Sequence, residues 1–361
     1  MYLVVDAHED LAWNALIFER EYNRSALATR RAEENSLAAA LSGHTLLGLP
    51  EYLQGRVAVI FGTLFVPPAR LLTGRKEDVP AYVNARQAHN LYAHQLEYYH
   101  RLAAEHRQFR LIGNRGDLEQ VLASWESDDL LARRVGLVPL MEGADGIRSP
   151  AEAEWWMERG LRIVGLAWAG TRYAGGTGEP GPLTPAGRRL LKVMADLGLI
   201  LDLSHASDQS FLEALDRFEG TVIASHSNPR ALLKETPRYE RALSDEMIRR
   251  LAQRGGVIGI VPYNRFLKSD WQLSDGKAAV TLRDVVAMID HVCQVAGSAA
   301  HIGLGSDFDG GFGVESVPAE IDTVADLQKI GPALRARGYS EPDVRGILGL
   351  NWINLLRRGL P

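Results

Sequence analysis

The sequence has one cysteine, Cys293, among its 361 residues. A single thiol excludes disulfides within the chain and zinc sites built from several thiolates. Any bound metal ion must therefore be held by histidine and carboxylate side chains. A reducing compartment is compatible with this composition.

Basic clusters and long apolar runs are also missing. The formal net charge is −5, and lysine and arginine are interspersed with acidic residues, which argues against a nucleic acid as a partner. No apolar run is long enough to span a bilayer, and the opening segment MYLVVDAHED lacks the basic and apolar regions of a secretory signal. We therefore expect a cytoplasmic protein without a membrane partner.

Short runs rich in apolar and β-branched residues predict strands that are buried on both faces. The eight runs span Tyr2–Val5, Arg56–Phe65, Val135–Met141, Leu161–Ala167, Leu199–Leu203, Thr221–Ala224, Val257–Val261 and His301–Leu304. Segments with helical spacing lie between most of them. These segments span Asp78–Arg107, Pro150–Arg159, Pro185–Leu197, Asp208–Phe218, Ser244–Arg254 and Leu282–Ala296.

Eight strands that alternate with helices predict an α/β fold, the (β/α)8 TIM barrel. We expect residues 1–361 to form a single barrel domain with an insertion near residues 20–53. A C-terminal extension is expected from about residue 316, ending in a helix around Asp343–Arg358.

Two of the predicted strands end in the same pattern, an apolar run followed by serine and histidine. The pattern reads LDLSH at His205 and IASH at His226. The carboxyl ends of barrel strands meet at one face, where such barrels carry out chemistry. Consecutive strands therefore present two imidazoles side by side, as a pair of metal ligands would require.

Acidic side chains follow other predicted strands. After the first strand, His8 and Asp10 share one side of an extended segment, whereas Glu9 faces the other. Glu142 ends the third strand, and Asp307 follows the eighth. Each residue alone is also typical of a turn or of the core. Their arrival from several strands at one barrel face predicts a metal centre.

Five motifs, in this order, resemble those of the membrane (renal) dipeptidase family, peptidase family M19, in its soluble bacterial form. They are HxD at 8–10, MEG at 141–143, DLSH at 202–205, SHSNPR at 225–230 and GSDFDG at 305–310. The resemblance extends from residue 3 to about residue 355. It implies a TIM barrel of the metallo-dependent hydrolase type.

The resemblance implies a centre of two Zn²⁺ ions. His8, Asp10 and Glu142 would bind the first ion, and Glu142, His205 and His226 the second. Glu142 would then bridge two ions about 3.5 Å apart. Nitrogen and oxygen ligands suit zinc, although Mn²⁺ or Co²⁺ could occupy the same set. Because relatives commonly dimerise, the resemblance also suggests a homodimer.

The implied reaction is hydrolysis of a dipeptide to free amino acids by a hydroxide that bridges the two metal ions. Glu142, as the bridging ligand, and Asp307 would be catalytic, with Asp307 also binding the substrate amine and transferring protons. Asp309, two residues on, is the rival for that role. Arg241, in the segment RALSD, would hold the substrate carboxylate.

Two positions depart from the family pattern. Between His8 and Asp10 the family usually has asparagine, whereas this chain has Glu9, which keeps both ligands. After the fourth predicted strand the family has a histidine that contacts the substrate carbonyl, whereas this chain has Trp168. An indole has a single N–H donor and is larger, so we expect slow hydrolysis of ordinary dipeptides or a pocket for a smaller or flatter substrate. Arg172 or Tyr173, in the following loop, could supply the missing donor.

Two other functions stay open from the sequence. The same metals could hydrolyse a related amide, lactam or lactone, which the loss of the fourth-strand histidine favours. A catalytically silent metal-binding barrel is the other alternative, and the intact set of metal ligands argues against it.

Overall fold

The computed structural model describes residues 1–72, 79–234 and 239–361. Its strands form one sheet in which every neighbouring pair is parallel. The nine strands are β1 (Val4–Glu9), β2 (Val57–Leu64), β3 (Phe109–Leu111), β4 (Val135–Glu142), β5 (Ile163–Gly165), β6 (Ile200–Asp202), β7 (Val222–Ala224), β8 (Val257–Ile260) and β9 (Ile302–Leu304).

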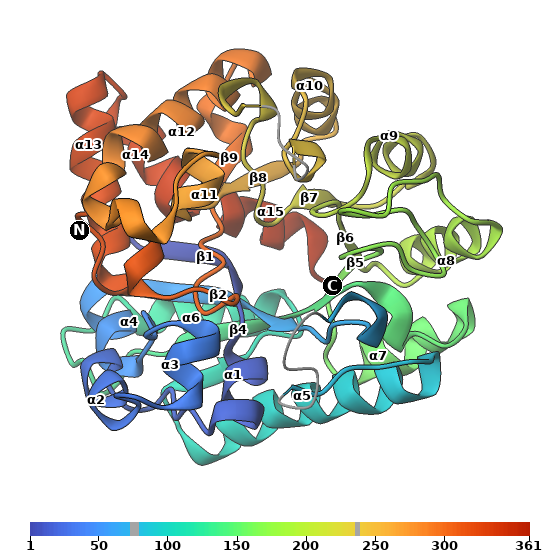
Figure 1. Ribbon diagram of the computed structural model, residues 1–361, viewed down its shortest axis with the longest axis horizontal. Helices are drawn as coiled ribbons and strands as arrows, with labels where there is room; N and C mark the ends of the chain where they lie inside the picture. Colours follow the sequence, from blue (N-terminus) through green and yellow to red (C-terminus); the bar gives the residue numbers. More distant parts are fainter. Residues whose placement is uncertain (73–78, 235–238) are drawn as a thin grey trace.

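Eight of these strands close into a TIM barrel (Figure 1). β1 pairs with β2 and with β9, and β2 pairs directly with β4. β3 pairs with β4 and lies outside the barrel. The predicted barrel is therefore confirmed, and each of the eight predicted runs overlaps a barrel strand.

Two features of the sheet differ from the prediction. The strand β3 was not predicted, because it has three residues and only Phe109 is fully buried, which leaves a weak apolar signal. β1 starts at Val4 and runs through His8 to Glu9, beyond the predicted end at Val5. Polar residues at a strand end resemble a loop in sequence, although here all six residues of β1 are buried.

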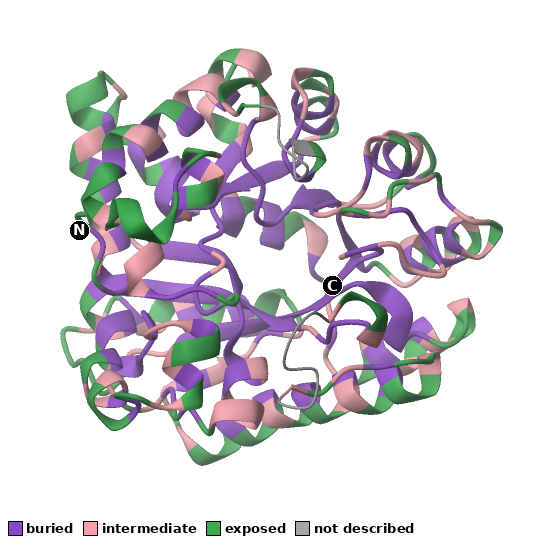
Figure 2. Ribbon diagram, in the orientation of Figure 1, coloured by how far each residue is buried: buried purple, intermediate pink, exposed green. Residues whose placement is uncertain are grey.

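Helices surround the barrel and turn their apolar faces toward the strands, as the burial pattern shows (Figure 2). In α12, for example, Val285, Ile289 and Val292 are buried. The helices are α1 (Leu11–Phe18), α2 (Ala26–Ala32), α3 (Leu37–Ser42), α4 (Leu49–Gly55), α5 (Ala85–Glu105), α6 (Arg115–Ser124), α7 (Ala153–Glu158), α8 (Pro185–Asp196), α9 (Asp208–Arg217), α10 (Asp245–Gln253), α11 (Asn264–Leu267), α12 (Leu282–Ala296), α13 (Ile330–Arg337), α14 (Glu341–Arg345) and α15 (Asn351–Gly359).

The predicted helical segments are all helical in the structure, with shifts at their ends. The long helix α5 starts at Ala85, after the N-cap Asn84, whose side chain accepts a hydrogen bond from the Gln87 backbone N–H. Asp78, where this helix was predicted to start, lies outside the described residues. The segment predicted from Pro150 opens with a 3₁₀ turn before α7 begins at Ala153.

The two predicted elaborations have helical structure of their own. The insertion near residues 20–53 contains α2, α3 and most of α4. In the C-terminal extension, α14 and α15 are joined by a π-helical turn at Gly346–Leu350. Gly349 in this turn lies against β1, where a Cβ atom would come within 2.6 Å of the Leu3 carbonyl oxygen.

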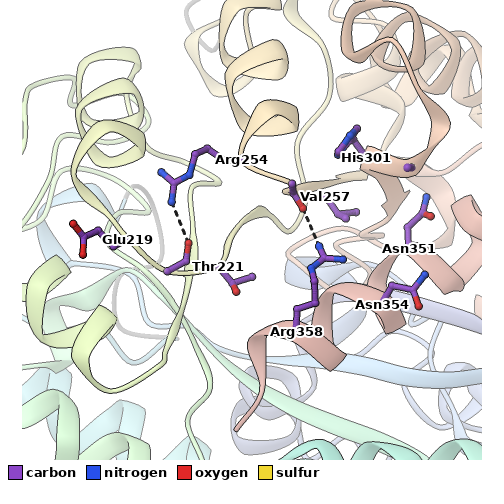
Figure 3. A pocket seen from close by; sticks show the side chains of 11 residues that line it. Glu219, Thr221, Arg254, Val257, His301, Asn351, Asn354 and Arg358 are labelled. Atoms are coloured by element: carbon purple, nitrogen blue, oxygen red, sulfur yellow. Dashed lines mark hydrogen bonds between the residues drawn. The ribbon is translucent and has the colours of Figure 1, made fainter.

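The end of the barrel at which β7, β8 and β9 begin is closed by side chains that bind backbone carbonyls (Figure 3). Arg254 donates to the carbonyls of Phe218 and Gly220, and Arg358 donates to that of Gly255. A hollow of about 560 Å³ lies among these residues. The hydrogen bonds give this end of the barrel a structural role.

The opposite end holds the carboxyl ends of the strands at a common level. Glu142 at the end of β4 pairs with Gly165 of β5, and Gly165 pairs with Asp202 of β6. The register therefore brings the residues that follow each strand to the same face.

None of the helices in the described residues combines the length and the apolar character that a membrane span requires.

Candidate metal centre

The side chains predicted as metal ligands converge at this face of the barrel. His8 lies in β1, Asp10 directly precedes α1, Glu142 ends β4, and His205 and His226 follow β6 and β7. Ligand atoms of His8, Asp10 and Glu142 lie within 4.8 Å of one another, and so do those of Glu142, His205 and His226. The structure thus brings all five together in two sets that share Glu142.

One carboxylate oxygen is the centre of this cluster. Glu142 Oε1 lies 3.1 Å from His205 Nε2, 3.2 Å from His226 Nε2 and 3.6 Å from His8 Nε2. The His8 Nε2 atom is also 3.9 Å from Asp10 Oδ2. Three imidazole nitrogens therefore face the same oxygen atom from different strands.

Burial of these carboxylates and imidazoles is energetically unfavourable unless a cation is bound among them. Burial, and next the charge of Arg241, lowers the pKa of His8 to about 3 and holds the pKa of His205 well below its usual value. Burial, and next the charge of Asp10, holds the pKa of Glu142 well above the usual range. Neutral imidazoles and crowded carboxylates are the forms that bind divalent ions, whose charge offsets the burial of the carboxylates.

Two atoms of the cluster have no hydrogen-bond partner within the part of the chain that the structure describes. His8 Nε2 and Asp10 Oδ1 are buried and accept no hydrogen bond from the described residues. Buried polar atoms are nearly always satisfied, so orphaned acceptors at a shared point indicate a missing ligand. The donor set of nitrogen and oxygen atoms fits divalent metal ions.

Several of the site residues adopt uncommon backbone conformations. His205, Asp307 and Asp309 have φ values of 64°, 59° and 62°, in the left-handed region that non-glycine residues rarely enter. Gly143, directly after Glu142, has a φ of 82°. Such conformations concentrate at functional sites, where the surrounding structure compensates their cost.

Asp307 and Arg241 lie at the edge of the cluster. Asp307 Oδ1 is 3.9 Å from His8 Nε2, and burial raises the pKa of Asp307 to about 7 although Arg241 opposes the rise. The buried Arg241 donates to Ser227 Oγ at 3.0 Å and to the His226 carbonyl at 2.6 Å. Its Nε–H has no acceptor among the described residues. One donor of the guanidinium is therefore free beside the cluster.

Asp309 has a different environment from Asp307. Its Oδ2 atom accepts from Arg20 at 3.0 Å, from the Tyr22 hydroxyl at 2.8 Å and from the Thr45 hydroxyl at 2.6 Å. Its Oδ1 atom accepts from the backbone N–H of Leu46 at 3.1 Å. Both oxygens are therefore engaged by the insertion, and Asp309 fastens that insertion to the barrel.

Trp168 lines the cavity above the cluster, which has a volume of about 630 Å³. Its ring lies 5.0 Å from that of Phe65 and 6.1 Å from that of His205, and Phe65 lies 5.6 Å from Trp13. These rings form one aromatic wall. Sequence reasoning missed Trp13 and Phe65 as site residues, for which the only signal was their position: Phe65 ends the second predicted strand, and Trp13 lies three residues after Asp10.

The other two residues of the predicted substrate site are turned away. The Tyr173 hydroxyl is buried and donates to the carbonyl of Ile147. The Arg172 side chain donates to the carbonyl of Arg148 and lies 3.7 Å from Asp145. Neither lines the cavity. The prediction of a substitute donor at Arg172 or Tyr173 is therefore not supported, because the loop after β5 directs both toward the loop after β4.

Comparisons with known proteins identify the family of this chain. The sequence model described as "Membrane dipeptidase (Peptidase family M19)" matches residues 1–358. A dipeptidase of Claviceps purpurea is 28% identical over 332 residues, covering 88% of this chain and 69% of that protein. An uncharacterised Klebsiella pneumoniae protein is 30% identical over 260 residues, covering 69% of this chain and 89% of its own.

Solved structures give the same result. A dipeptidase described as a metallopeptidase of family M19 has a TM-score of 0.79 and 26% identity, with 99% of both chains covered. A metallopeptidase from Rhodobacter sphaeroides, bound to a phosphinate mimic of the dipeptide L-Ala-D-Ala, has a TM-score of 0.77 and 25% identity, again with 99% of both chains covered. The chain therefore belongs to the membrane dipeptidase family, peptidase family M19, and is a metal-dependent dipeptidase.

Proposed function

We propose that this protein is a binuclear zinc dipeptidase that hydrolyses dipeptides to free amino acids. The observation that carries the proposal is the sharing of Glu142 Oε1 by three histidine nitrogens at 3.1–3.6 Å. His8, Asp10 and Glu142 would hold one ion, and Glu142, His205 and His226 the other. Nitrogen and oxygen donors without thiolate suit Zn²⁺, with Mn²⁺ or Co²⁺ as substitutes.

Two such ions, when bound, supply a water molecule of lowered pKa and a positive charge that polarises the scissile carbonyl. The chain supplies proton transfer through Asp307, whose carboxylate stands beside His8 and opens on the cavity. Asp307 accepts a proton from the attacking water and donates it to the nitrogen of the leaving amino acid. Asp309 does not compete for this role because both of its oxygens are engaged.

Arg241 binds the carboxylate of the substrate in this proposal. Arg241 lines the cavity, its terminal guanidinium nitrogens hold Ser227 and the backbone of His226, and its buried Nε–H has no acceptor among the described residues. A free carboxylate is the ligand that satisfies a buried guanidinium donor best. The enzyme would therefore select short peptides with a free C-terminus. The dipeptide mimic bound by the Rhodobacter relative supports the same substrate class.

Trp168 favours a second candidate, a related amide, lactam or lactone as the substrate. The indole stands in the cavity wall where the resemblance places a histidine donor, and neither Arg172 nor Tyr173 in the loop after it lines the cavity. An ester or strained amide needs less polarisation of its carbonyl than an ordinary peptide bond.

The test is a substrate panel with zinc-supplemented protein. It contains L-L and L-D dipeptides, the same dipeptides as C-terminal amides, a tripeptide, a lactam and a lactone. The proposal predicts hydrolysis of free dipeptides with no more than trace rates on the amides. Hydrolysis of amides at the same rate, or of the lactone alone, would refute the dipeptidase assignment and favour the second candidate.

A further inference from the structure

The serine that precedes each of the two strand-end histidines belongs to a buried network beneath the metal centre. Ser225 precedes His226, and Ser204 precedes His205. Ser225 and Ser204 are 0% and 3% exposed. The proposed reaction gives neither hydroxyl a part, so the repeated pattern needs another explanation.

The hydroxyl of Ser225 contacts one carboxylate, two imidazoles and the hydroxyl of Ser204. Its Oγ atom lies 2.5 Å from Asp202 Oδ2, 2.8 Å from His226 Nδ1, 3.3 Å from Ser204 Oγ and 3.4 Å from His8 Nδ1. The other oxygen of Asp202 accepts the backbone N–H groups of Ser204 and Ser225, at 3.0 and 2.9 Å. Asp202 is itself buried, so these protein groups are its partners.

The direction of each hydrogen bond follows from these contacts. Because Oδ1 of Asp202 is taken by two N–H donors and Oδ2 is an acceptor, the Ser225 hydroxyl donates its hydrogen to Oδ2. Its two lone pairs then face the Nδ1 atoms of His226 and His8 and can accept from N–H groups there. A proton on Nδ1 leaves Nε2 of each ring unprotonated, and Nε2 is the atom that faces Glu142.

The backbone around Ser225 is held as tightly as its side chain. The neighbouring strand residues Gly259 and Gly305 approach its carbonyl oxygen so closely that a Cβ atom on either would lie 1.9 Å from it. Both positions therefore require glycine. The Ser225 hydroxyl therefore has a fixed position between β6, β7 and β1.

We propose that Ser225, held by Asp202, is a positioning residue that fixes the tautomer of one histidine in each half of the metal centre. His226 belongs to one proposed ligand set and His8 to the other, so a single hydroxyl prepares both. This inference rests on the proposed function only in assigning the histidines to metal ions. A partner on the second ring nitrogen orients a ligating histidine and raises its basicity.

The third histidine has a different partner. His205 Nδ1 lies 3.0 Å from the Thr177 hydroxyl and does not contact Ser225, whereas its Nε2 lies 3.0 Å from His226 Nε2. Removing the Ser225 hydroxyl should therefore change the tautomers of His226 and His8 directly and that of His205 only through its contact with His226. The shorter contact, 2.8 against 3.4 Å, predicts a larger effect on His226 than on His8.

The experiment compares Ser225→Ala with the wild type and with Ser124→Ala, which removes a serine hydrogen bond in the outer helix α6. Long-range ¹H–¹⁵N NMR spectra of the metal-free proteins report the protonated nitrogen of each histidine. Competition with a chromophoric chelator reports zinc affinity. We expect Nδ1–H on His226 in the wild type, a mixture of tautomers in Ser225→Ala, and a loss of zinc affinity of roughly tenfold to a hundredfold.

Asp202→Asn is the second variant, for the case that Ser225→Ala does not fold. An amide cannot accept on both sides, so either the backbone donors or the Ser225 hydroxyl loses an acceptor. A wild-type tautomer of His226 together with unchanged zinc affinity, in whichever variant folds, would overturn the proposal. The NMR readout does not depend on activity, so a wild type that binds zinc without cleaving dipeptides would refute the proposed function alone.

Discussion

The Nε2 atoms of His205 and His226 lie 3.0 Å apart, although the two residues follow different strands. Both atoms also face Glu142 Oε1, at 3.1 and 3.2 Å. Two nitrogen ligands of one tetrahedral zinc ion, at about 2.0–2.1 Å from it, would be roughly 3.3 Å apart. The pair is therefore already spaced as ligands of one ion.

His205→Ala should remove mainly the second ion. The remaining ligands of that ion, Glu142 and His226, are too few for a stable site, whereas His8, Asp10 and Glu142 are untouched. We expect elemental analysis to find about one zinc ion fewer per chain than in the wild type. His94→Ala, on an exposed position of α5, is the matched control and should keep the full zinc content. An unchanged zinc content in His205→Ala would contradict the assignment.

Arg241→Ala should raise KM for dipeptides by roughly tenfold to a hundredfold, since hydrogen bonds to a charged group contribute roughly 1.5–3 kcal/mol. Arg241→Lys keeps the charge but loses the planar fork, so its KM should lie between those of the wild type and Arg241→Ala. The control is chemical: C-terminally amidated dipeptides should be equally poor substrates for all three proteins. A wild-type KM in Arg241→Ala would show that another group binds the carboxylate.

Asp307→Asn should reduce activity, whereas Asp309→Asn should reduce stability. The first should keep its zinc and its thermal stability but lose most of kcat, because the amide cannot carry the proton. The second removes the buried charge that pairs with Arg20 at 3.0 Å and should cost roughly 3 kcal/mol of unfolding free energy. Urea unfolding and steady-state kinetics measure the two effects. Loss of zinc from Asp307→Asn would make that residue a ligand instead.

The metal-free protein should lose stability in acid through His8. Burial, and next the charge of Arg241, lowers the pKa of His8 to about 3. Below about pH 6.5 the unfolded chain takes up a proton that the folded chain does not, so folding becomes less favourable as pH falls toward 3. Relative to His8→Gln, the wild type should lose about 1.4 kcal/mol per pH unit in this window. Parallel pH profiles of the two proteins in urea unfolding would contradict the shift.

Trp168→His introduces the donor that the sequence resemblance implies at this position. If the indole limits carbonyl polarisation, kcat on ordinary dipeptides should rise, because one such donor contributes roughly 10²–10³ in rate. Trp168→Phe is the control, since it keeps most of the aromatic contact with Phe65 and supplies no donor. Equal rates for all three proteins would show that the departure from the family pattern carries no catalytic consequence.

The convergence of the proposed metal ligands could be predicted from sequence because most of them lie at or just beyond the end of an apolar run. The strand ends of a barrel converge whatever conformation the loops adopt. The residue types and the order of the strands were therefore sufficient to predict that His8, Glu142, His205 and His226 lie together. The direction in which a loop points its side chains could not be predicted from the sequence in this way. Tyr173 is only five residues from Trp168, yet its hydroxyl is used by the Ile147 carbonyl in the neighbouring loop.

Long-range polar contacts could not be predicted from the sequence either. The part of Asp309 in fastening the insertion depends on Arg20, Tyr22 and Thr45, which are more than 260 residues away along the chain. Nothing local distinguishes Asp309 from Asp307, because both follow the same strand. The serine of the repeated Ser–His pattern was visible, but its partner Asp202 lies on the preceding strand and is identified only by the register of β6 and β7.

Titration of the metal-free protein with zinc, while dipeptide hydrolysis is followed, tests the central claim most directly. Because two ligand sets share Glu142, the account predicts that activity reaches its maximum only when two zinc ions per chain are bound. Hydrolysis that is complete at one ion per chain, or that persists in the chelator-treated protein without zinc, would contradict it.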